Sequence, residues 1–327
     1  MDRLLRNSRV LVTGGAGFIG SNLTESLLEA GNEVVCLDNF STGKRKNIES
    51  FLSHPRYKLI EGDIRNYDDC VKAVNGIEYV FHEAALGSVP RSIKDPVITT
   101  DVNIGGFVKM LFASKESGVK RFIYAASSST YGDHPDLPKV EDKIGSPLSP
   151  YAITKYVNEL YADIFSKTYG IEVIGLRYFN VFGRRQDPDG AYAAVIPKFV
   201  KALMNHERPR INGDGSVSRD FTYVDNVIQV NHLSALVKDK SALNEVYNVA
   251  HGERTTLNQL FKMLRDKASV FDARIGLIEP EYGPFRAGDI PHSLASVVKA
   301  EKKLGYNPTH TVDQGLSEAV EWYWNNL

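Results

Sequence analysis

The sequence lacks most features that mark secreted, membrane-bound or nucleic-acid-binding proteins. It contains only two cysteines, Cys36 and Cys70, which do not make a disulfide framework. Its net charge of −1 provides no excess of positive charge for nucleic acid or a membrane surface. It has no apolar run long enough to span a bilayer, and residues 1–9 hold too short an apolar stretch for a signal peptide. We therefore expect a soluble cytoplasmic protein that binds neither nucleic acid nor membrane.

The rest of the composition is that of a globular protein. Hydrophobic residues make up 43% of the chain and charged residues 24%, which argues against disorder. At 327 residues the chain is long for a single core, so we expect one large domain or two. The sequence shows no metal-ligand cluster, and we expect no metal. The basic run Lys44–Lys46 is interpreted as part of a solvated loop.

Four glycines lie close together near the N-terminus, in the stretch LVTGGAGFIG over residues 11–20. A buried strand is predicted before them and an amphipathic helix after them. Gly14 permits a tight turn, Gly17 lets an anion approach the backbone, and Gly20 allows close packing of helix and strand. The N-terminus of the helix also offers free N–H groups to an anion. This stretch is typical of a turn that binds the pyrophosphate of a dinucleotide.

A second predicted strand, residues 33–37, ends at Asp38. An acid at this place suits the adenosine ribose hydroxyls of NAD and repels the additional phosphate of NADP. The polar turn 39–43 follows it, where an adenosine would lie. Further strand ends carry Asp63 and Ile64, which we expect beside the adenine, and the small residues 84–87, which leave room for a cofactor. NAD is therefore the expected cofactor.

Strands and helices alternate along the first half of the chain. Strands are predicted at 9–12, 33–37, 57–60, 79–82, 121–126 and 172–177, and helices at 68–75, 96–117 and 150–169. This order predicts an α/β fold: a doubly wound parallel (Rossmann) sheet with a smaller mixed α/β C-terminal substrate lobe. We expect the NAD-binding domain over 1–177, with additions near 225–250, and the lobe over 178–327. Helices are also predicted at 194–205, 225–237, 256–266, 293–303 and 313–325.

Tyr151 and Lys155 lie four residues apart on the predicted helix 150–169, so they share one face. A free tyrosine has a pKa of about 10, too high for a base at neutral pH. A nearby ammonium group favours the phenolate and lowers that pKa. Ser127 ends a predicted strand and can reach the same point, where its hydroxyl would bind a substrate hydroxyl. His82 lies inside a strand pattern, so we interpret it as a packed core residue.

Together these motifs resemble the extended short-chain dehydrogenase/reductase family, and within it the bacterial UDP-N-acetylglucosamine (UDP-hexose) 4-epimerases. The segment 177–180 fits the same pattern, and Arg219-Asp220-Phe221 and Arg286-Ala287-Gly288-Asp289 match nucleotide-sugar motifs. The resemblance implies Ser127, Tyr151 and Lys155 as catalytic residues. It implies an NAD site made of Gly14, Gly17, Phe18, Ile19, Gly20, Asp38, Asn39, Ser41, Thr42, Gly43, Asp63, Ile64, Ala84, Leu86, Tyr151, Lys155 and Tyr178. The implied substrate site contains Ser88, Ser128, Ser129, Asn180, Arg219, Arg286, Asp289 and Ser293.

The resemblance also implies a reaction. In related dehydratases and decarboxylases an acid follows the position of Ser127, whereas here Ser128, Ser129 and Thr130 stand there. The missing acid favours epimerisation: Tyr151 takes the 4-hydroxyl proton, C4 gives a hydride to NAD, and the hydride returns to the other face of the 4-keto sugar. Arg219 and Arg286, two isolated arginines in the second half of the chain, would clamp the diphosphate of the nucleotide sugar.

The preferred sugar is inferred from one position in particular. Ser293 matches a pocket-wall residue that is bulky in epimerases restricted to UDP-glucose, so a 2-acetamido group would fit. We therefore expect UDP-GlcNAc and UDP-GalNAc as substrates, with UDP-glucose and UDP-galactose accepted weakly. A UDP-glucose 4-epimerase and a UDP-N-acetylglucosaminuronate 4-epimerase stay open as alternatives, and Arg91 or Lys94 would then meet the carboxylate of the uronic acid.

Other classes of protein fit less well. A non-catalytic dinucleotide-binding regulator would be expected to lack Tyr151 or Lys155. A hydroxysteroid-type dehydrogenase would need no diphosphate clamp and should have a more apolar C-terminal lobe. The resemblance implies a homodimer packed through the helices near 100–117 and 151–168, and a product used for cell-surface polysaccharide.

Overall fold

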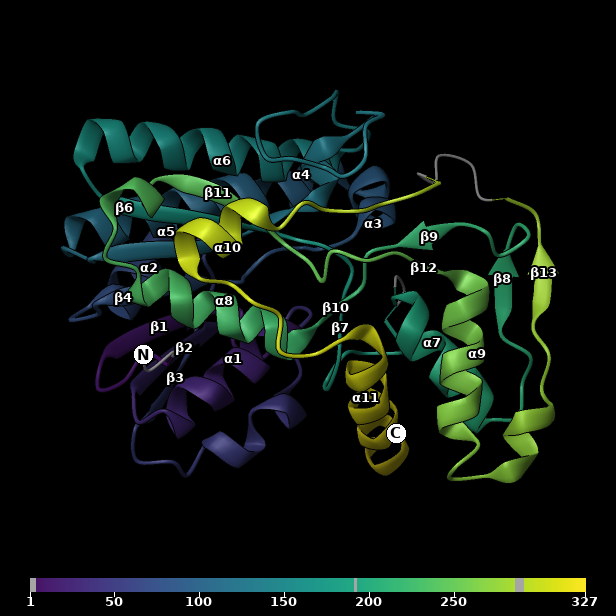
Figure 1. Ribbon diagram of the computed structural model, residues 1–327. Helices are drawn as coiled ribbons and strands as arrows, with labels where there is room; N and C mark the ends of the chain where they lie inside the picture. The colour runs from purple at the N-terminus through teal and green to yellow at the C-terminus, as the bar shows by residue number, and fades with distance from the viewer. Residues whose placement is uncertain (1–3, 191–192, 286–290) are drawn as a thin grey trace.

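The computed structural model describes residues 4–190, 193–285 and 291–327. A central sheet of seven parallel strands runs through the molecule in the order β11-β6-β5-β4-β1-β2-β3 (Figure 1). The predicted doubly wound sheet is therefore confirmed. Strand β11, which lies within the predicted additions near 225–250, joins the edge of the sheet beside β6. The strands of the sheet are β1 (Arg9–Thr13), β2 (Glu33–Asp38), β3 (Tyr57–Glu61), β4 (Tyr79–His82), β5 (Arg121–Ser127), β6 (Glu172–Tyr178) and β11 (Glu245–Val249).

Both faces of this sheet are buried, because successive residues of each strand enter different cores. On one face, Val10 and Phe81 pack in the same core as Leu23 of helix α1 (Phe18–Glu29) and Val230 of α8 (Val224–Leu236). On the other face, neighbouring residues of the same strands pack with α2 (Tyr67–Val74), α5 (Phe107–Glu116) and α6 (Pro150–Tyr169). The inner strands β1, β2 and β4 are therefore nearly continuous apolar runs, as the sequence indicated, whereas the edge strand β3 carries the exposed Lys58.

Helix α6 has the boundaries that the sequence predicted. It begins after Ser149, whose side chain accepts a hydrogen bond from the N–H of Ala152, and Pro150 occupies the first turn. It ends at Gly170, which has a positive φ of 74°. A buried ion pair of 2.7 Å between Glu159 of α6 and Arg177 of β6 ties the helix to the sheet. The helix that carries Tyr151 and Lys155 is thus fixed at both ends and in its middle.

The long helix predicted over 96–117 is confirmed in place but not in form. It consists of α4 (Pro96–Thr100), a π-helical segment over Asp101–Gly106, and α5. The side chain of Asn103 in the π segment is 2% exposed and bonds the backbone N–H of Leu86 at 2.8 Å. A separate short helix, α3 (Val89–Lys94), precedes it. The buried His82 packs between Phe107 and Phe122, which confirms its interpretation as a core residue.

The predicted helix over 293–303 is wrong in its first part, because helix α10 extends over Val298–Leu304. The backbone of 293–296 is bonded to other segments instead: the N–H of Ser293 donates to Ser218, and that of Ser296 donates to Lys139. Residues whose N–H groups pair with distant carbonyls are not available for the bonds inside a helix. Hydrogen bonds to distant segments therefore replace the helix that the sequence pattern of 293–296 predicts.

The second half of the chain builds a smaller region beside the sheet (Figure 1). Its helices α7 (Val195–Met204), α9 (Leu257–Ala268) and α11 (Val312–Asn326) pack against one another. Its strands form three pairs: β7 (Val181–Phe182) with β10 (Thr222–Tyr223), β9 (Ser218–Arg219) with β12 (Thr255–Thr256), and β8 (Arg210–Asn212) with β13 (Glu281–Gly283). Within the described residues, no helix has the length and apolar character needed to cross a membrane.

Candidate active site

A cavity of about 700 Å³ opens at the C-terminal ends of the sheet strands. Residues from both halves of the chain line it, from Gly14 in the first turn to Ala194 before α7. Every residue of the predicted NAD site lies on its wall, and so does Ser127. The structure therefore brings together a set of residues that the sequence spreads over 165 positions, from 14 to 178. Ligands of doubly wound sheets bind in this position.

The glycine-rich turn forms one end of the cavity. Gly14 has a positive φ of 68°, and a Cβ atom on it would lie 2.8 Å from the backbone of Ala84. A Cβ on Gly20 would collide with the carbonyl oxygen of Gly14. Helix α1 begins directly after Gly17, so its first N–H groups lie at the cavity wall. The turn is thus shaped to admit a pyrophosphate close to the backbone.

Asp38 has a structural task as well as a place on the wall. Its carboxylate accepts hydrogen bonds from the N–H of Ala16, at 2.9 Å, and from that of Phe40, at 2.8 Å. These bonds attach the glycine-rich turn to the end of β2. Burial raises the pKa of Asp38, and the two amides oppose that rise. Binding of the adenosine ribose by Asp38 stays a prediction.

Ser127, Tyr151 and Lys155 meet at the end of β5. The Nζ of Lys155, which is 4% exposed, donates to the carbonyl oxygen of Ala125 at 2.6 Å. The hydroxyl of Ser127 accepts two hydrogen bonds from Ser129, at 3.1 Å from its N–H and 2.9 Å from its Oγ. Since both bonds use the oxygen of Ser127, its proton is free to donate to Tyr151, with which it is hydrogen-bonded.

Burial and charge act against each other in this corner. Burial raises the pKa of Tyr151, and the bond to Ser127 lowers it. Burial lowers the pKa of Lys155 to about 8. The pKa values of the two groups are therefore moved apart, that of Tyr151 upward and that of Lys155 downward, because each group resists becoming charged inside the protein.

Glu83 is a cavity residue that the sequence reasoning missed. It follows the end of β4, and its carboxylate accepts a hydrogen bond of 2.8 Å from the hydroxyl of Tyr178. The amide of Asn231 donates to the same hydroxyl at 2.9 Å. Burial raises the pKa of Glu83 to about 7. Its place, directly after a strand that ends at the cavity, is the signal that could have identified it.

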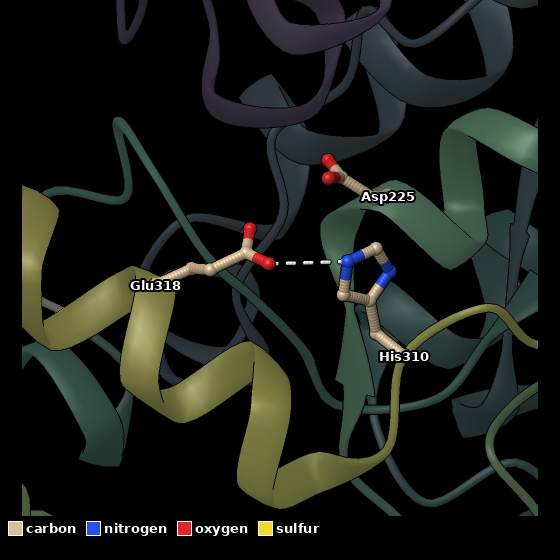
Figure 2. A group of neighbouring side chains, drawn as sticks. All are labelled: Asp225, His310 and Glu318. Carbon is tan, nitrogen blue, oxygen red and sulfur yellow. Dashed lines mark ion pairs between the residues drawn. The ribbon is translucent and has the colours of Figure 1, made fainter.

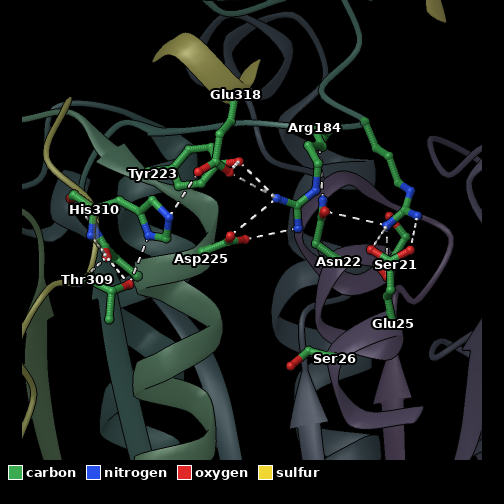
Figure 3. A network of polar contacts seen from close by, with 12 residues as sticks. Ser21, Asn22, Glu25, Ser26, Arg184, Tyr223, Asp225, Thr309, His310 and Glu318 are labelled. Atoms are coloured by element: carbon green, nitrogen blue, oxygen red, sulfur yellow. Dashed lines mark hydrogen bonds and ion pairs between the residues drawn. The ribbon is translucent and has the colours of Figure 1, made fainter. Parts of the chain in front are cut away.

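The segment over residues 183–187 also reaches the cavity, from the other half of the chain. The Nζ of Lys44 lies 2.7 Å from a carboxylate oxygen of Asp187, and both residues line the wall. Arg185 pairs with Glu25 of α1 at 2.6 Å. Figure 3 shows Glu25 on one side of Arg184, whose guanidinium group points to the other side, toward Asp225. Lys44 is half-exposed, as expected of a residue in a solvated loop, but it also lines the first cavity.

A second cavity of about 550 Å³ adjoins the first, since Val181 and Ala194 line both. Its walls are mainly apolar, with Phe199, Phe221 and Phe285 among them, and they carry the polar groups of Asn180, Arg210, Asn212 and Arg219. An apolar pocket with a few fixed polar groups is typical of a small-molecule site. A guanidinium group of Arg219 donates to the backbone of Ser218 and Pro291.

The predicted substrate residues that the structure describes fall into three groups. Asn180 and Arg219 line the second cavity, and the amide of Asn180 bonds the hydroxyl of Ser293 at 3.3 Å. Ser129 is bonded to Ser127, at the corner that Ser127 forms with Tyr151 and Lys155, and Ser128 lies between the two serines in the chain. Ser88 accepts the N–H of Arg91 as the cap of α3, and like Ser128, Ser129 and Ser293 it lines neither cavity. The predicted residues Arg286 and Asp289 lie outside the described residues.

Outside the two cavities, three residues that could bind a metal lie close together, although their spacing in the sequence does not predict a metal site. Atoms of Asp225, His310 and Glu318 lie within 4.8 Å of one another (Figure 2). The guanidinium of Arg184 already lies 3.0 Å from Asp225 and 3.8 Å from Glu318, and the hydroxyl of Tyr223 donates to Glu318 (Figure 3). Both carboxylates thus have a cationic partner, and the group is a network that joins α8 to α11.

Comparison with known proteins agrees with this geometry. Residues 10–250 match the model of the NAD dependent epimerase/dehydratase family. UDP-glucose 4-epimerase of Mycolicibacterium smegmatis is 34% identical over 97% of this chain and 99% of its own. UDP-N-acetylglucosamine 4-epimerase of Methanobrevibacter ruminantium superposes with a TM-score of 0.92 at 39% identity, covering 99% and 100% of the two chains. The NAD complex of Thermus thermophilus UDP-glucose 4-epimerase gives 0.85 at 32% identity, covering 98% and 100%.

The chain belongs to the NAD dependent epimerase/dehydratase family. Its cofactor is NAD. The cavity at the strand ends fits this cofactor on the observations above: a cradle at Gly14 that a side chain would fill, the free end of α1, and an acid at the end of β2.

The charge of Glu83 raises the pKa of both Tyr151 and Lys155. Replacing Glu83 with Gln keeps an acceptor for Tyr178 but removes that charge, so Tyr151 should ionise at lower pH. The measurement is the absorbance of the phenolate during a pH titration, with a Tyr151→Phe protein as the blank. Tyr178→Phe is the matched control, since it removes the hydrogen bond and keeps the charge. An unchanged titration in Glu83→Gln would show that the carboxylate does not act on Tyr151.

Proposed function

We propose that this NAD-dependent UDP-sugar 4-epimerase acts on N-acetylated sugars and interconverts UDP-GlcNAc and UDP-GalNAc, with UDP-glucose and UDP-galactose as weaker substrates. The proposal rests on the contact of Ser293 with Asn180, at 3.3 Å, beside the second cavity. Ser293 lines neither cavity itself, but it lies against Asn180, which lines the second, and its small side chain would leave space there for a 2-acetamido group. The similarity to the M. ruminantium enzyme supports the same preference.

In the proposed mechanism Tyr151 takes the proton of the sugar 4-hydroxyl. NAD, which the residues around Gly14 and Asp38 in the first cavity would hold, would supply a reversible hydride acceptor for C4 of the sugar. Ser127 donates a hydrogen bond to the reacting oxygen, and its own oxygen is held by Ser129. Lys155, fixed on the carbonyl of Ala125, places a positive charge near the phenolate. Tyr151 then returns the proton to the sugar oxygen, and because the hydride also ends on C4, the reaction would have no net oxidation.

The substrate sits, in this proposal, across the two adjoining cavities. The second cavity would hold the uridine between its apolar walls and the diphosphate beside Arg219, because a guanidinium group binds phosphate oxygens in a fixed geometry. Asn180 stands between this cavity and the catalytic corner, where it would contact the sugar diphosphate. Arg286 and Asp289 remain part of the proposed site from the sequence alone.

We also propose a homodimer. Ile153, Leu160 and Ile164 of α6 are each about half exposed and lie at spacings that share one face of the helix. Phe112 of the neighbouring α5 is partly exposed as well. An apolar face of this kind is typical of a surface that another subunit covers. Sedimentation equilibrium should give twice the mass of one chain, and a mass of one chain would contradict the dimer.

The function is tested by incubating the purified protein, without added NAD, with UDP-GlcNAc or UDP-glucose and recording the sugar anomers by proton NMR. UDP-GalNAc should appear faster than UDP-galactose. Tyr151→Phe should show no turnover and still contain NAD, because it lacks only the proton acceptor. A product that has lost water or carbon dioxide would overturn the assignment as an epimerase, and faster formation of UDP-galactose would overturn the sugar preference.

Ser293→Tyr should weaken binding of UDP-GlcNAc much more than that of UDP-glucose. A large side chain in a packed wall costs about 1–3 kcal/mol, roughly a 5- to 150-fold rise in KM for the acetylated sugar. KM for both sugars is the measurement, and Ser293→Ala is the control that removes the hydroxyl without adding volume. Equal losses on the two substrates would contradict the role of Ser293 in selecting the sugar.

A further inference from the structure

Asp220 is a buried acid directly behind residues that line the second cavity. It lies between β9 and β10, immediately after Arg219, and it is fully buried. Its carboxylate accepts hydrogen bonds from three backbone N–H groups: His251 at 3.2 Å, Gly252 at 3.2 Å and Ala295 at 3.1 Å. Burial raises the pKa of this carboxyl to about 6, and the three amides oppose the rise. Burying a carboxylate costs free energy unless hydrogen-bond donors satisfy its oxygens, so these three bonds are what allow Asp220 to be buried.

The three amides belong to segments that are distant in the sequence. His251 and Gly252 follow the edge strand β11, and Ala295 lies in the segment that returns from the outer strand β13. That returning segment runs beside β9: Ser218 donates its N–H to Pro291, and Ser293 donates its N–H to Ser218. The carboxylate therefore fastens the sheet edge and the returning segment to the same point of β9 and β10.

The same residue also holds Asn180 with its backbone. The amide of Asn180 donates to the carbonyl oxygen of Asp220 at 2.9 Å and to the hydroxyl of Ser293 at 3.3 Å. Asn180 has a positive φ of 38°, a conformation that needs support from its surroundings. Arg219 precedes Asp220, and Pro291 and His292 precede Ser293, so the ties of Asp220 fix both sides of the cavity wall.

We propose that Asp220 is a positioning residue for the nucleotide sugar: from behind the wall, it sets the spacing between Arg219, Asn180 and the segment 291–293. This inference rests on the proposed function, since it assigns the second cavity to the nucleotide. Asp220 does not line either cavity and does not touch the substrate in this proposal. It acts through the three groups that do.

An acid fits this task better than an amide. All of the donors that reach the side chain of Asp220 are N–H groups, and a carboxylate offers acceptors on both of its oxygens. An asparagine would turn an NH₂ group toward one of these donors, so at least one tie would be lost. The change hardly alters the volume of the side chain, which keeps the packing of the surroundings comparable.

The experiment uses the NAD-loaded full-length protein and measures the binding of UDP by calorimetry and KM and kcat for the UDP-sugar. Asp220→Asn should raise the Kd of UDP and the KM at least tenfold, with a smaller change in kcat and an unchanged NAD content. Asp239→Asn is the matched control, because Asp239 also accepts a backbone N–H, that of Ser241, but lies at neither cavity. It should behave as the wild-type protein does.

Asp220→Glu provides a second variant, which keeps the charge and moves the carboxylate by one methylene group. It should raise the Kd of UDP above the wild-type value even if the asparagine variant does not fold, and it should raise that Kd less than Asp220→Asn does if both variants fold. Equal UDP binding by wild type and either variant, or a loss in kcat alone, would overturn the role of Asp220. If the wild-type protein itself does not bind UDP, the proposed function fails instead, and the two outcomes are thereby distinguished.

Discussion

A parallel sheet that is covered on both faces has only its strand ends available for binding. Val10 and Leu11 are neighbours in β1, yet they are buried in cores on opposite sides of the sheet. Because helices fill both sides, polar groups that face a ligand are placed with the least loss of core at the last residue of a strand or directly after it. Asp38, Glu83 and Ser127 all stand at such ends, on β2, β4 and β5. The position of the whole site follows from this burial.

The sequence predicts those parts of the site that depend on local chemistry. The glycine turn requires a positive φ at Gly14, and Tyr151 and Lys155 share a face because they lie one helical turn apart. Such relations hold within a few residues, so they are visible without any tertiary structure. The order of strands and helices likewise predicts the parallel sheet, because a parallel pair requires a crossover.

The remaining parts depend on contacts between distant segments. Glu83 lines the same cavity as Tyr151 and Lys155, and it is held there by Tyr178, which donates to it from 95 residues later in the chain. The segment from 293 is not helical because it pairs with Ser218. The group of Asp225, His310 and Glu318 forms only when α11 packs beside α8, and Arg184 then occupies it. No periodicity or spacing in the sequence predicts these contacts, because each one depends on where the fold places both of the residues involved.

The close backbone contact at Gly14 restricts which residues can stand at that end of the first cavity. The turn after β1 lies against the backbone of Ala84, and no side chain separates the two. The width of the cavity at this point is therefore set by main-chain atoms, and exchanging residues cannot adjust it. The walls of the second cavity are formed by side chains instead, among them Asn180, Phe199 and Phe221. Residues there can be exchanged without moving the glycine turn, whereas a side chain at Gly14 would meet the backbone of Ala84.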